Sequence, residues 1–455
     1  METTDVLIIG GSAAGIVAAT TGKSFYPDKK FMLVRHEEQV LVPCGIPYIF
    51  GTLDNSEANV VPDAVLFNAG IELKIGHTDF IDQEKKQCRF SDGAVVAFEK
   101  LVLATGSTPI IPSWLPGTDL ENVYTVPKDK VYLDAFKKRL DGLEKVAIIG
   151  GGFIGVELAD ELSKAGKKVT IVEKMPHILN LAFDRELALK AEAVFQSKGV
   201  DIKTGSGARE LQGSQKVEAL ILNNDERIET DAVILSVGYR PNSELAARSG
   251  LDINEMGFIK VNEYMRTQHF DIFAVGDCAE KFSFLTRTLK GLMLASTACA
   301  EARIAGMNLY KLSTVRTFNG TIAIFCTAIG DQAFGAAGVT ENLAKERGFE
   351  IISGLFEGVD RHPGTLPDTQ PQIVKLIASM DSGVILGGEV MGGNSIGELI
   401  NMIGFVIQNR MSIDALLTSQ IGTHPLLTAA PTAYPLIKAA EVIAKKKRSM
   451  KPLAA

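Results

Sequence analysis

The segment of the chain that is best suited to chemistry is Val42-Pro43-Cys44-Gly45-Ile46-Pro47-Tyr48, which places one thiol between two prolines. Pro43 cannot continue a helix, so we expect Cys44 on the first turn of a new helix over residues 44–49. Backbone N–H groups and the helix dipole stabilise a thiolate there and lower the pKa of the thiol. Cys44 is therefore our candidate redox group. The alternative is a buried cysteine that packs as a small apolar side chain.

The spacing of the other four cysteines identifies no disulfide or metal-site partner for Cys44. The five cysteines are scattered and contain no C-x-x-C pair, which predicts neither a disulfide framework nor a metal site. The C-x4-C spacing of a dithiol reductase is absent too, because Ile49 stands at that place.

A nucleotide-binding pattern precedes this segment. An apolar strand over residues 5–9 leads into a glycine turn, then a helix over 16–21 and a strand over 31–34. Gly10 permits the tight turn and Gly15 permits close packing of helix and strand, so that a phosphate can lie at the helix N-terminus. The turn consists of Gly10, Gly11, Ser12, Ala13, Ala14 and Gly15.

The carboxylate that should bind a ribose hydroxyl is displaced in this first copy. The strand is followed by Arg35, His36 and Glu37, so Glu37 is the candidate acid and Arg35 is its unexplained neighbour.

A second copy of the pattern begins at residue 145. A strand over 145–149 leads into Gly150, Gly152 and Gly155, then a helix over 156–165 and a strand over 168–172. Glu173 lies 23 residues after Gly150, where a carboxylate would bind an adenosine 2′-hydroxyl and repel a 2′-phosphate. This predicts NADH as the preferred nucleotide, with NADPH possible because Lys174 is adjacent.

The repeat extends to later strands. Residues 101–103 end in Ala104-Thr105-Gly106, and residues 233–237 end in Gly238. The proline-rich stretch 107–116 reads as an irregular crossing between two domains. The strand 271–275, followed by Gly276 and Asp277, is expected to return to the first domain.

These patterns predict an α/β fold with two Rossmann-like nucleotide-binding domains and an α+β C-terminal domain. In the last domain, strands over 373–377 and 383–390 alternate with helices over 396–408 and 434–445. The predicted domains are 1–113 with 245–316, then 114–244, then 317–455.

The charge and the hydropathy exclude some partners. With 47 basic and 54 acidic residues the net charge is −7, and no basic stripe points to nucleic acid. No apolar run of about 18 residues and no N-terminal leader occur, so we expect a cytoplasmic protein without a membrane role.

Together the motifs resemble the single-cysteine branch of the flavin-dependent pyridine nucleotide-disulfide oxidoreductases. That branch includes CoA-disulfide reductases, CoA-persulfide or sulfur reductases, NADH oxidases and NADH peroxidases. The resemblance rests on both glycine turns, Cys44-Gly45 with Pro47-Tyr48, Gly51, Ala104-Thr105-Gly106, Glu157, Gly238 with Arg240-Pro241-Asn242, and Gly276-Asp277.

The resemblance implies FAD on the first turn, NADH or NADPH on the second, and a homodimer formed by the C-terminal domain. Phe153 would shield the flavin and Glu157 would lie near the nicotinamide; ordinary packing and a plain surface glutamate are the alternatives. The cofactor-binding residues are then expected to be Gly10, Gly11, Ser12, Ala13, Ala14, Gly15, Arg35, Glu37, Pro43, Ala104, Thr105, Gly106, Gly150, Gly152, Phe153, Ile154, Gly155, Glu157, Glu173, Gly238, Gly276, Asp277, Ala295 and Thr297.

The implied reaction passes electrons from NAD(P)H through FAD to a sulfur held at Cys44, and the substrate would be CoA disulfide, CoA persulfide or polysulfide. Ala13 stands where the peroxidases and water-forming oxidases carry a histidine, which favours the sulfur reductases. Residues 40–43 lack the Ser-Phe-x-Asn that CoA enzymes typically carry before the cysteine. The alternatives are an NADH oxidase forming hydrogen peroxide, an NADH peroxidase, a ferredoxin reductase-like electron carrier, and an inactive relic.

A proton donor for the leaving thiolate is also expected. His362 and His424 each precede a proline, and relatives with two redox cysteines place a His-Pro near their sulfur. We favour His424 over His362 as the catalytic acid. The alternative is that these histidines cap turns at the dimer interface.

Overall fold

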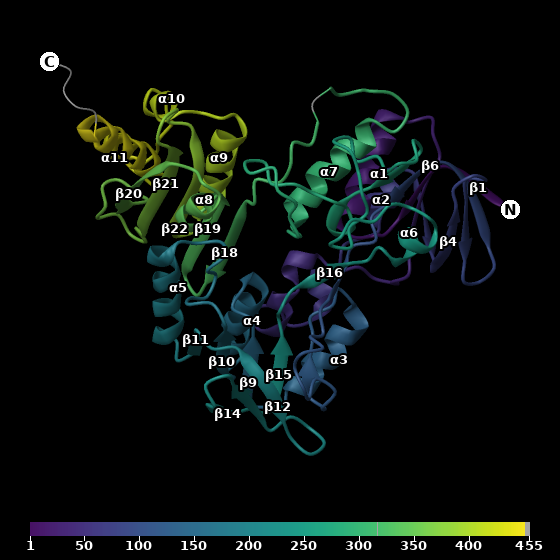
Figure 1. Ribbon diagram of the computed structural model, residues 1–455, viewed down its shortest axis with the longest axis horizontal. Helices are drawn as coiled ribbons and strands as arrows, with labels where there is room; N and C mark the ends of the chain where they lie inside the picture. The colour runs from purple at the N-terminus through teal and green to yellow at the C-terminus, as the bar shows by residue number, and fades with distance from the viewer. Residues whose placement is uncertain (316, 451–455) are drawn as a thin grey trace.

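The computed structural model describes residues 1–315 and 317–450, which form three bodies, each built on its own large sheet (Figure 1). Residue 316 and the end of the chain at 455, where two of the predicted domains stop, lie outside the described residues. None of the helices within the described residues is long and apolar enough to cross a membrane.

The first body is built on a seven-stranded sheet in the order β3-β2-β1-β6-β5-β4, with β17 also paired to β6. The strands β3, β2, β1, β6 and β17 are parallel, so the ends of β1, β6 and β17 lie at one edge. That pairing brings residues 272–274 back to the first sheet, as predicted. The strands are β1 Glu2–Ile9, β2 Phe31–Arg35, β3 Ile71–Ile75, β4 Thr78–Asp82, β5 Gln87–Phe90, β6 Val95–Leu103 and β17 Ile272–Ala274.

Two helices, α1 (Ala13–Phe25) and α7 (Ala295–Met307), pack closely against one another beside this sheet (Figure 1). A Cβ atom on Gly306 would lie 3.0 Å from both Ala18 O and Gly22 N, so a larger residue there would push the two helices apart. The contact fixes the C-terminal half of α7 against α1.

The second body contains a parallel sheet in the order β11-β10-β9-β15-β8 and a small antiparallel sheet β12-β13-β14. The predicted strands at 145–149 and 168–172 are confirmed, and the second extends to Glu173. The elements are β8 Val123–Tyr124, α3 Lys130–Leu140, β9 Lys145–Ile149, α4 Phe153–Lys164, β10 Lys168–Glu173, α5 Arg185–Ser197, β11 Asp201–Thr204, β12 Ala208–Gln212, β13 Ala219–Leu222, β14 Arg227–Glu229 and β15 Ala232–Leu235.

The crossing between the first two bodies is more regular than predicted. β7 (Ser107–Pro109) pairs antiparallel with β16 (Tyr239–Pro241), so the prediction of an irregular 107–116 segment is wrong at its start. The short strand is possible because Pro109 stands at its end, where a missing donor costs little. The short helices α2 Ala64–Asn68 and α6 Glu244–Arg248 also belong to this half of the chain.

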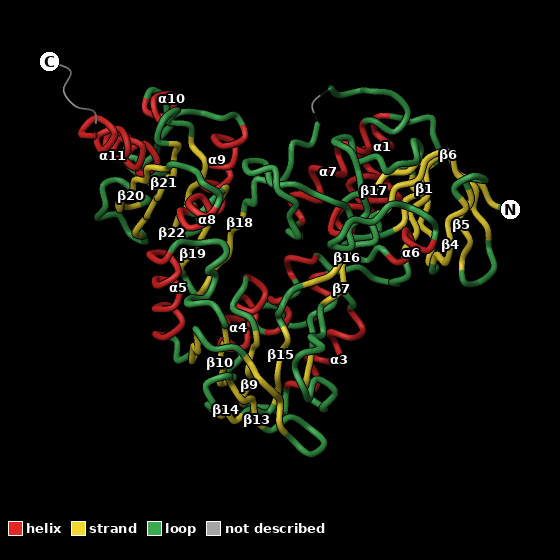
Figure 2. The backbone as a smooth tube through the Cα atoms, viewed as in Figure 1, coloured by secondary structure: helices red, strands yellow, loops and turns green. Residues whose placement is uncertain are grey.

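The third body is an antiparallel sheet in the order β18-β19-β22-β21-β20 with helices packed against it (Figure 2). The predicted helix 396–408 is confirmed at both ends. The elements are β18 Phe325–Ile329, β19 Gln332–Gly338, α8 Glu341–Glu346, β20 Ile351–Val359, β21 Pro371–Ser379, β22 Ile385–Gly392, α9 Ile396–Gln408, α10 Ile413–Leu417 and α11 Pro435–Met450.

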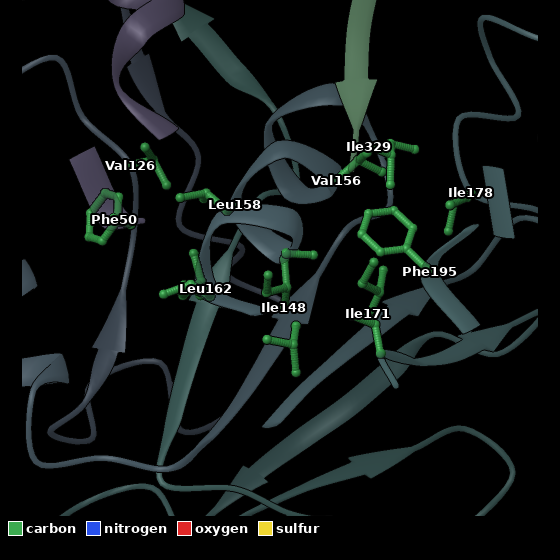
Figure 3. Packing of buried hydrophobic residues seen from close by; sticks show 14 of the residues in the cluster. Phe50, Val126, Ile148, Val156, Leu158, Leu162, Ile171, Ile178, Phe195 and Ile329 are labelled. Atoms are coloured by element: carbon green, nitrogen blue, oxygen red, sulfur yellow. The ribbon is translucent and has the colours of Figure 1, made fainter. Parts of the chain in front are cut away.

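One hydrophobic core joins parts of all three bodies. Figure 3 shows Phe50 from the segment after Cys44, Leu158 and Leu162 from α4, and Ile329 from β18 in the same cluster. Burial of this continuous apolar surface fixes the Cys44 segment relative to α4 and β18.

A buried charged cluster reinforces the contact between the second and third bodies. Lys375 lies 2.9 Å from Asp184 and 3.0 Å from Glu341. Glu389 accepts the N–H of Asp184 at 3.0 Å, and its second carboxylate oxygen has no partner. Burial, together with the adjacent Asp184 carboxylate, raises the pKa of Glu389 well above the ordinary value.

Replacing Glu389 by glutamine should change how stability depends on pH. A carboxyl whose pKa is raised by folding contributes stability below its unfolded pKa and loses it as the pH rises towards the folded pKa. Above pH 5 the free energy of unfolding of Glu389→Gln should therefore rise relative to that of the native protein by on the order of 1 kcal/mol per pH unit. This holds over the range in which the folded native protein keeps the Glu389 proton. Thermal unfolding at pH 5 and 8 measures this difference.

Glu255→Gln, a substitution at an exposed residue, is the control and should have the same unfolding temperature as the native protein at both pH values. A difference between Glu389→Gln and the native protein that stays constant from pH 5 to 8 would contradict the assignment.

Candidate active site

Cys44 lies on a short 3-10 turn, Pro43–Gly45, that is followed by a second one, Pro47–Phe50. The predicted helix over 44–49 is therefore wrong. Pro47 has no N–H to donate, so the helical hydrogen bonds stop there and restart after it. The Cys44 side chain is solvent-accessible, whereas Ile46 and Ile49 turn into the core.

The segment that follows Cys44 is fastened to α4. The N–H and the hydroxyl of Thr52 both donate to the carboxylate of Glu161, the hydroxyl at 2.9 Å. A Cβ on Gly51 would lie 2.4 Å from the Glu161 carbonyl oxygen, so glycine is needed for the approach. Lys137 of α3 donates to the carbonyls of Ile49 and Asp54. Cys44 is thereby held against the helix that begins at the second glycine turn.

The same helix contacts β18 of the third body. The Thr327 hydroxyl donates to Glu157 Oε1 at 2.9 Å. One turn earlier, the rings of Phe153 and Phe325 stack with their centroids 4.8 Å apart. Burial raises the pKa of Glu157 to about 7, against the lowering effect of the Thr327 hydrogen bond. Glu157 can therefore hold a proton near neutral pH.

The electrostatics around Cys44 differ from the prediction. Burial raises the pKa of the thiol, and Glu157, Cys326 and Asp277 add to the increase, while Lys128 opposes it. The predicted lowering by a helix dipole is wrong for the protein alone, because a three-residue 3-10 turn has no macrodipole comparable to that of an α-helix. The Lys128 charge favours the thiolate, whereas Glu157 and Asp277 disfavour it.

Cys326, a second thiol that acts electrostatically on Cys44, was missed from the sequence. It follows Phe325 on β18 and is exposed on one side. Partial burial and the Glu157 carboxylate raise the pKa of its thiol. No spacing signal could have revealed it, because 282 residues separate the two thiols.

The ends of three parallel strands bring the predicted residues of the first nucleotide site together. A Cβ on Gly10 would lie 2.0 Å from Ala104 O, and one on Gly276 would lie 2.9 Å from the Ala14 Cβ. A Cβ on Gly106 would meet nothing within 4 Å, so open space lies above this edge. The glycine turn and this space fit a dinucleotide.

A hydrogen-bond network that includes Lys128 lies at the same edge of the sheet. Asp277 accepts from Ser107 at 2.7 Å and from Lys128 at 2.7 Å. Burial opposes the charge of Asp277, but Lys128 and Ser107 outweigh it and lower the pKa of that carboxyl. Lys128 was not predicted, since it lies in the segment between β8 and α3, 149 residues from Asp277.

Other residues predicted for the first site lie near this edge but make internal contacts. Ala295 is the first residue of α7, and the buried Thr297 hydroxyl lies 3.0 Å from that of Thr321. Arg35 is buried and forms a bidentate pair with Asp63, and Glu37 lies 3.4 Å from His36.

The second glycine turn repeats the first. Cβ atoms on Gly150 and Gly155 would lie 2.2 Å from Ser236 O and 2.0 Å from Gly150 O, respectively, whereas one on Gly152 would meet nothing within 4 Å. Glu173 accepts the N–H groups of Gly151 at 2.7 Å and Met175 at 2.8 Å. Each carboxylate oxygen keeps a lone pair for a further donor. Phe153 and Ile154 start α4, and Gly238 follows β15 at the same edge.

The two histidines lie together on the third body. His362 Nδ1 lies 3.0 Å from Thr428 O, and the His362 N–H donates to Pro425 O at 3.1 Å. Within the described residues no hydrogen bond joins either histidine to the Cys44 segment. His424 is exposed, and Leu426 and Leu427 beside it are exposed apolar side chains.

Comparison with known families gives two matches along the chain. The family described as pyridine nucleotide-disulphide oxidoreductase matches residues 4–302, and its dimerisation domain matches residues 324–434.

Individual relatives carry two kinds of name. An NADH oxidase of Enterococcus faecalis is 28% identical over 92% of this chain and 95% of its own length. An NAD(P)H coenzyme A polysulfide/persulfide reductase of Pyrococcus horikoshii is also 28% identical, over 96% of this chain and 98% of its own length.

Two solved structures show the same division. A NAD-dependent persulfide reductase from A. fulgidus superposes with a TM-score of 0.90 at 27% identity, covering 99% of this chain and 86% of its own. A water-forming NADH oxidase from Lactobacillus brevis bound to NADH superposes with a TM-score of 0.88 at 26% identity, covering 98% and 99%.

Removing the Glu157 charge should change the reactivity of Cys44. Above pH 7 the Glu157 carboxylate is ionised and raises the pKa of Cys44, so Glu157→Gln should lower that pKa. Lys128→Met should raise it, because the cation that opposes the carboxylates is lost. The pH dependence of iodoacetamide alkylation of the FAD-free protein, followed on the Cys44 peptide by mass spectrometry, measures both effects. An unchanged or higher Cys44 pKa in Glu157→Gln would contradict this electrostatic account.

Proposed function

The chain belongs to the pyridine nucleotide-disulphide oxidoreductase family, and from this premise we propose that it reduces a small disulfide, persulfide or polysulfide at Cys44 with electrons from NAD(P)H. The observation that carries the proposal is the convergence on α4. The Cys44 segment, the second glycine turn and β18 all contact this one helix, with Glu157 at the shared point.

We assign residues 1–113 with 245–316 to FAD, 114–244 to NAD(P)H, and 317–455 to dimerisation. The open edge at Gly10, Ala104 and Gly276 supports the first assignment, and the Gly150 turn with Glu173 supports the second. FAD, when bound, supplies the two-electron carrier between the nicotinamide and sulfur.

The protein residues then have separate tasks. The Cys44 thiolate attacks one sulfur of the substrate, forms a new S–S bond with it and releases the other sulfur as a thiolate. Lys128 stabilises the Cys44 thiolate by its charge. Glu157 holds a proton at its carboxyl near neutral pH and can protonate a departing thiolate, which speeds its departure.

An NADH oxidase is the second candidate. The names of the Enterococcus faecalis and Lactobacillus brevis proteins favour it. The residue at position 13 argues against water formation, because the Ala13 methyl can neither donate nor accept a proton. Oxygen reduction by this chain should therefore be slow and should yield hydrogen peroxide.

We propose a homodimer in which the His424 loop of one copy covers the Cys44 segment of the other. The match of residues 324–434 to a dimerisation domain and the exposed Leu426 and Leu427 support this arrangement.

Cys44→Ser should abolish reduction of the sulfur substrate while FAD remains bound and NADH still reduces it. Cys326→Ser is the matched control, a second exposed thiol on the same electrostatic network. It should keep most of the activity. Steady-state NADH oxidation with CoA persulfide or polysulfide distinguishes the two variants. Full sulfur-reducing activity in Cys44→Ser would overturn the proposed function.

The nucleotide preference should depend on Glu173. The native protein should favour NADH, and Glu173→Gln should reduce the ratio of kcat/KM for NADH over NADPH by about tenfold, since one close charge repulsion is lost. Lys174→Met should increase the ratio, because the exposed ammonium can approach a 2′-phosphate. Equal efficiency of the native enzyme with both nucleotides would show that Glu173 does not face the ribose.

In the proposed dimer His424 of the other copy is a second proton donor to the departing thiolate beside Glu157, so His424→Ala should slow the reaction of the reduced enzyme with sulfur substrate and leave reduction by NADH unchanged. His362→Ala, in the adjacent loop, is the comparison. Stopped-flow traces with both half-reactions at native rates in His424→Ala would assign the histidine to the interface alone.

A further inference from the structure

The two glycine turns are structurally equivalent residue by residue. A Cβ on Gly10 would meet Ala104 O, and one on Gly150 would meet Ser236 O. The second residue of each turn contacts the last residue of the next strand. A Cβ on Gly11 would lie 2.5 Å from Arg35 Cδ, and one on Gly151 would lie 3.1 Å from Glu173 Cβ. Arg35 therefore occupies the place that Glu173 occupies in the second copy.

That exchange reverses the charge at the ribose end of the first turn. The carboxylate at this position of a dinucleotide fold accepts a hydrogen bond from a ribose hydroxyl. A guanidinium has only donors and cannot accept one. A site with Arg35 alone would lack the acceptor.

The Arg35 side chain is committed to protein groups. Its Nε donates to Glu37 O at 2.8 Å and its Nη2 donates to Glu38 O at 2.7 Å. Nη1 and Nη2 donate to the two oxygens of Asp63 at 2.6 and 2.9 Å. The Arg35 side chain is 2% exposed, whereas that of Asp63 is 32% exposed.

This geometry brings a carboxylate back to the strand end. Asp63 comes from the segment before α2, 28 residues from Arg35, and the bidentate pair fixes both of its oxygens. Each oxygen takes one guanidinium hydrogen bond and keeps a lone pair, and the partial exposure of the side chain leaves it accessible. The Arg35 charge also offsets the cost of holding an anion beside a nucleotide.

We propose that the Arg35–Asp63 pair forms the adenosine-ribose end of the first dinucleotide site, with the Asp63 carboxylate as the acceptor for the ribose 2′-hydroxyl. This assignment takes from the proposed function that the first site binds FAD. It displaces Glu37, whose carboxylate pairs with the exposed His36 and whose carbonyl is held by Arg35.

Binding of FAD and of its 2′-deoxyadenosine analogue to the FAD-free protein tests this directly. The native protein should bind FAD more tightly than the analogue by about tenfold, since a hydrogen bond to a charged acceptor is lost. In Asp63→Asn that ratio should fall towards one. Glu37→Gln should keep the native ratio, and so should the exposed substitution Asp28→Asn. Quenching of flavin fluorescence gives both affinities without any assay of turnover.

Arg35→Lys provides a second variant in case Asp63→Asn does not fold. Lysine keeps the charge but cannot hold both Asp63 oxygens, so the ratio should fall here as well. A native ratio near one, or a ratio that collapses in Glu37→Gln and persists in Asp63→Asn, would overturn the inference. A native protein that binds no FAD would instead refute the proposed function, so the two failures are distinguishable.

Discussion

The attachment of the Cys44 segment to α4 through Glu161 is the contact on which the site depends. Glu161 is 1% exposed, receives both donors of Thr52 and lies 2.7 Å from Lys164. The helix that carries it starts at the second glycine turn and presents Phe153 and Glu157 on its first turns. A single rigid element therefore positions the nucleotide turn, the buried acid and the thiol.

The same arrangement explains the unusual electrostatics. Burial is the largest cause of the raised pKa of Cys44; Glu157, Cys326 and Asp277 add to it, and Lys128 opposes them. A change in any of these charges therefore changes the pKa of the Cys44 thiol. The charge balance then responds to what Lys128 and Asp277 contact, because they are hydrogen-bonded to each other at 2.7 Å. Reactivity at sulfur is thus coupled to the edge where the first dinucleotide would bind.

The sequence predicted what is encoded over short distances. Both glycine turns follow from local patterns, and so do the strands beside them and the helix 396–408, because the backbone requirements of each element lie within some 30 residues. The 3-10 geometry at Cys44 differs from the predicted helix because Pro47 interrupts the helical hydrogen bonds a second time, four residues after Pro43.

The residues missed entirely are those brought in by tertiary contacts. Lys128, Cys326 and Asp63 are 149, 282 and 28 residues from the groups they act on, and their own neighbours in the chain carry no motif. Arg35 stands out in the sequence as a cation at the end of its strand, but its bidentate partner Asp63 is brought to it by the tertiary structure.

The central claim is that Cys44 delivers electrons to sulfur rather than to oxygen or peroxide. The most direct measurement is anaerobic reduction of the native holoenzyme with one equivalent of NADH, followed by stopped-flow mixing with CoA persulfide, polysulfide, hydrogen peroxide or oxygen. Our account predicts that a sulfur compound reoxidises the enzyme faster than either oxygen species. Reoxidation by hydrogen peroxide or oxygen at a rate equal to or above that of every sulfur compound would contradict it.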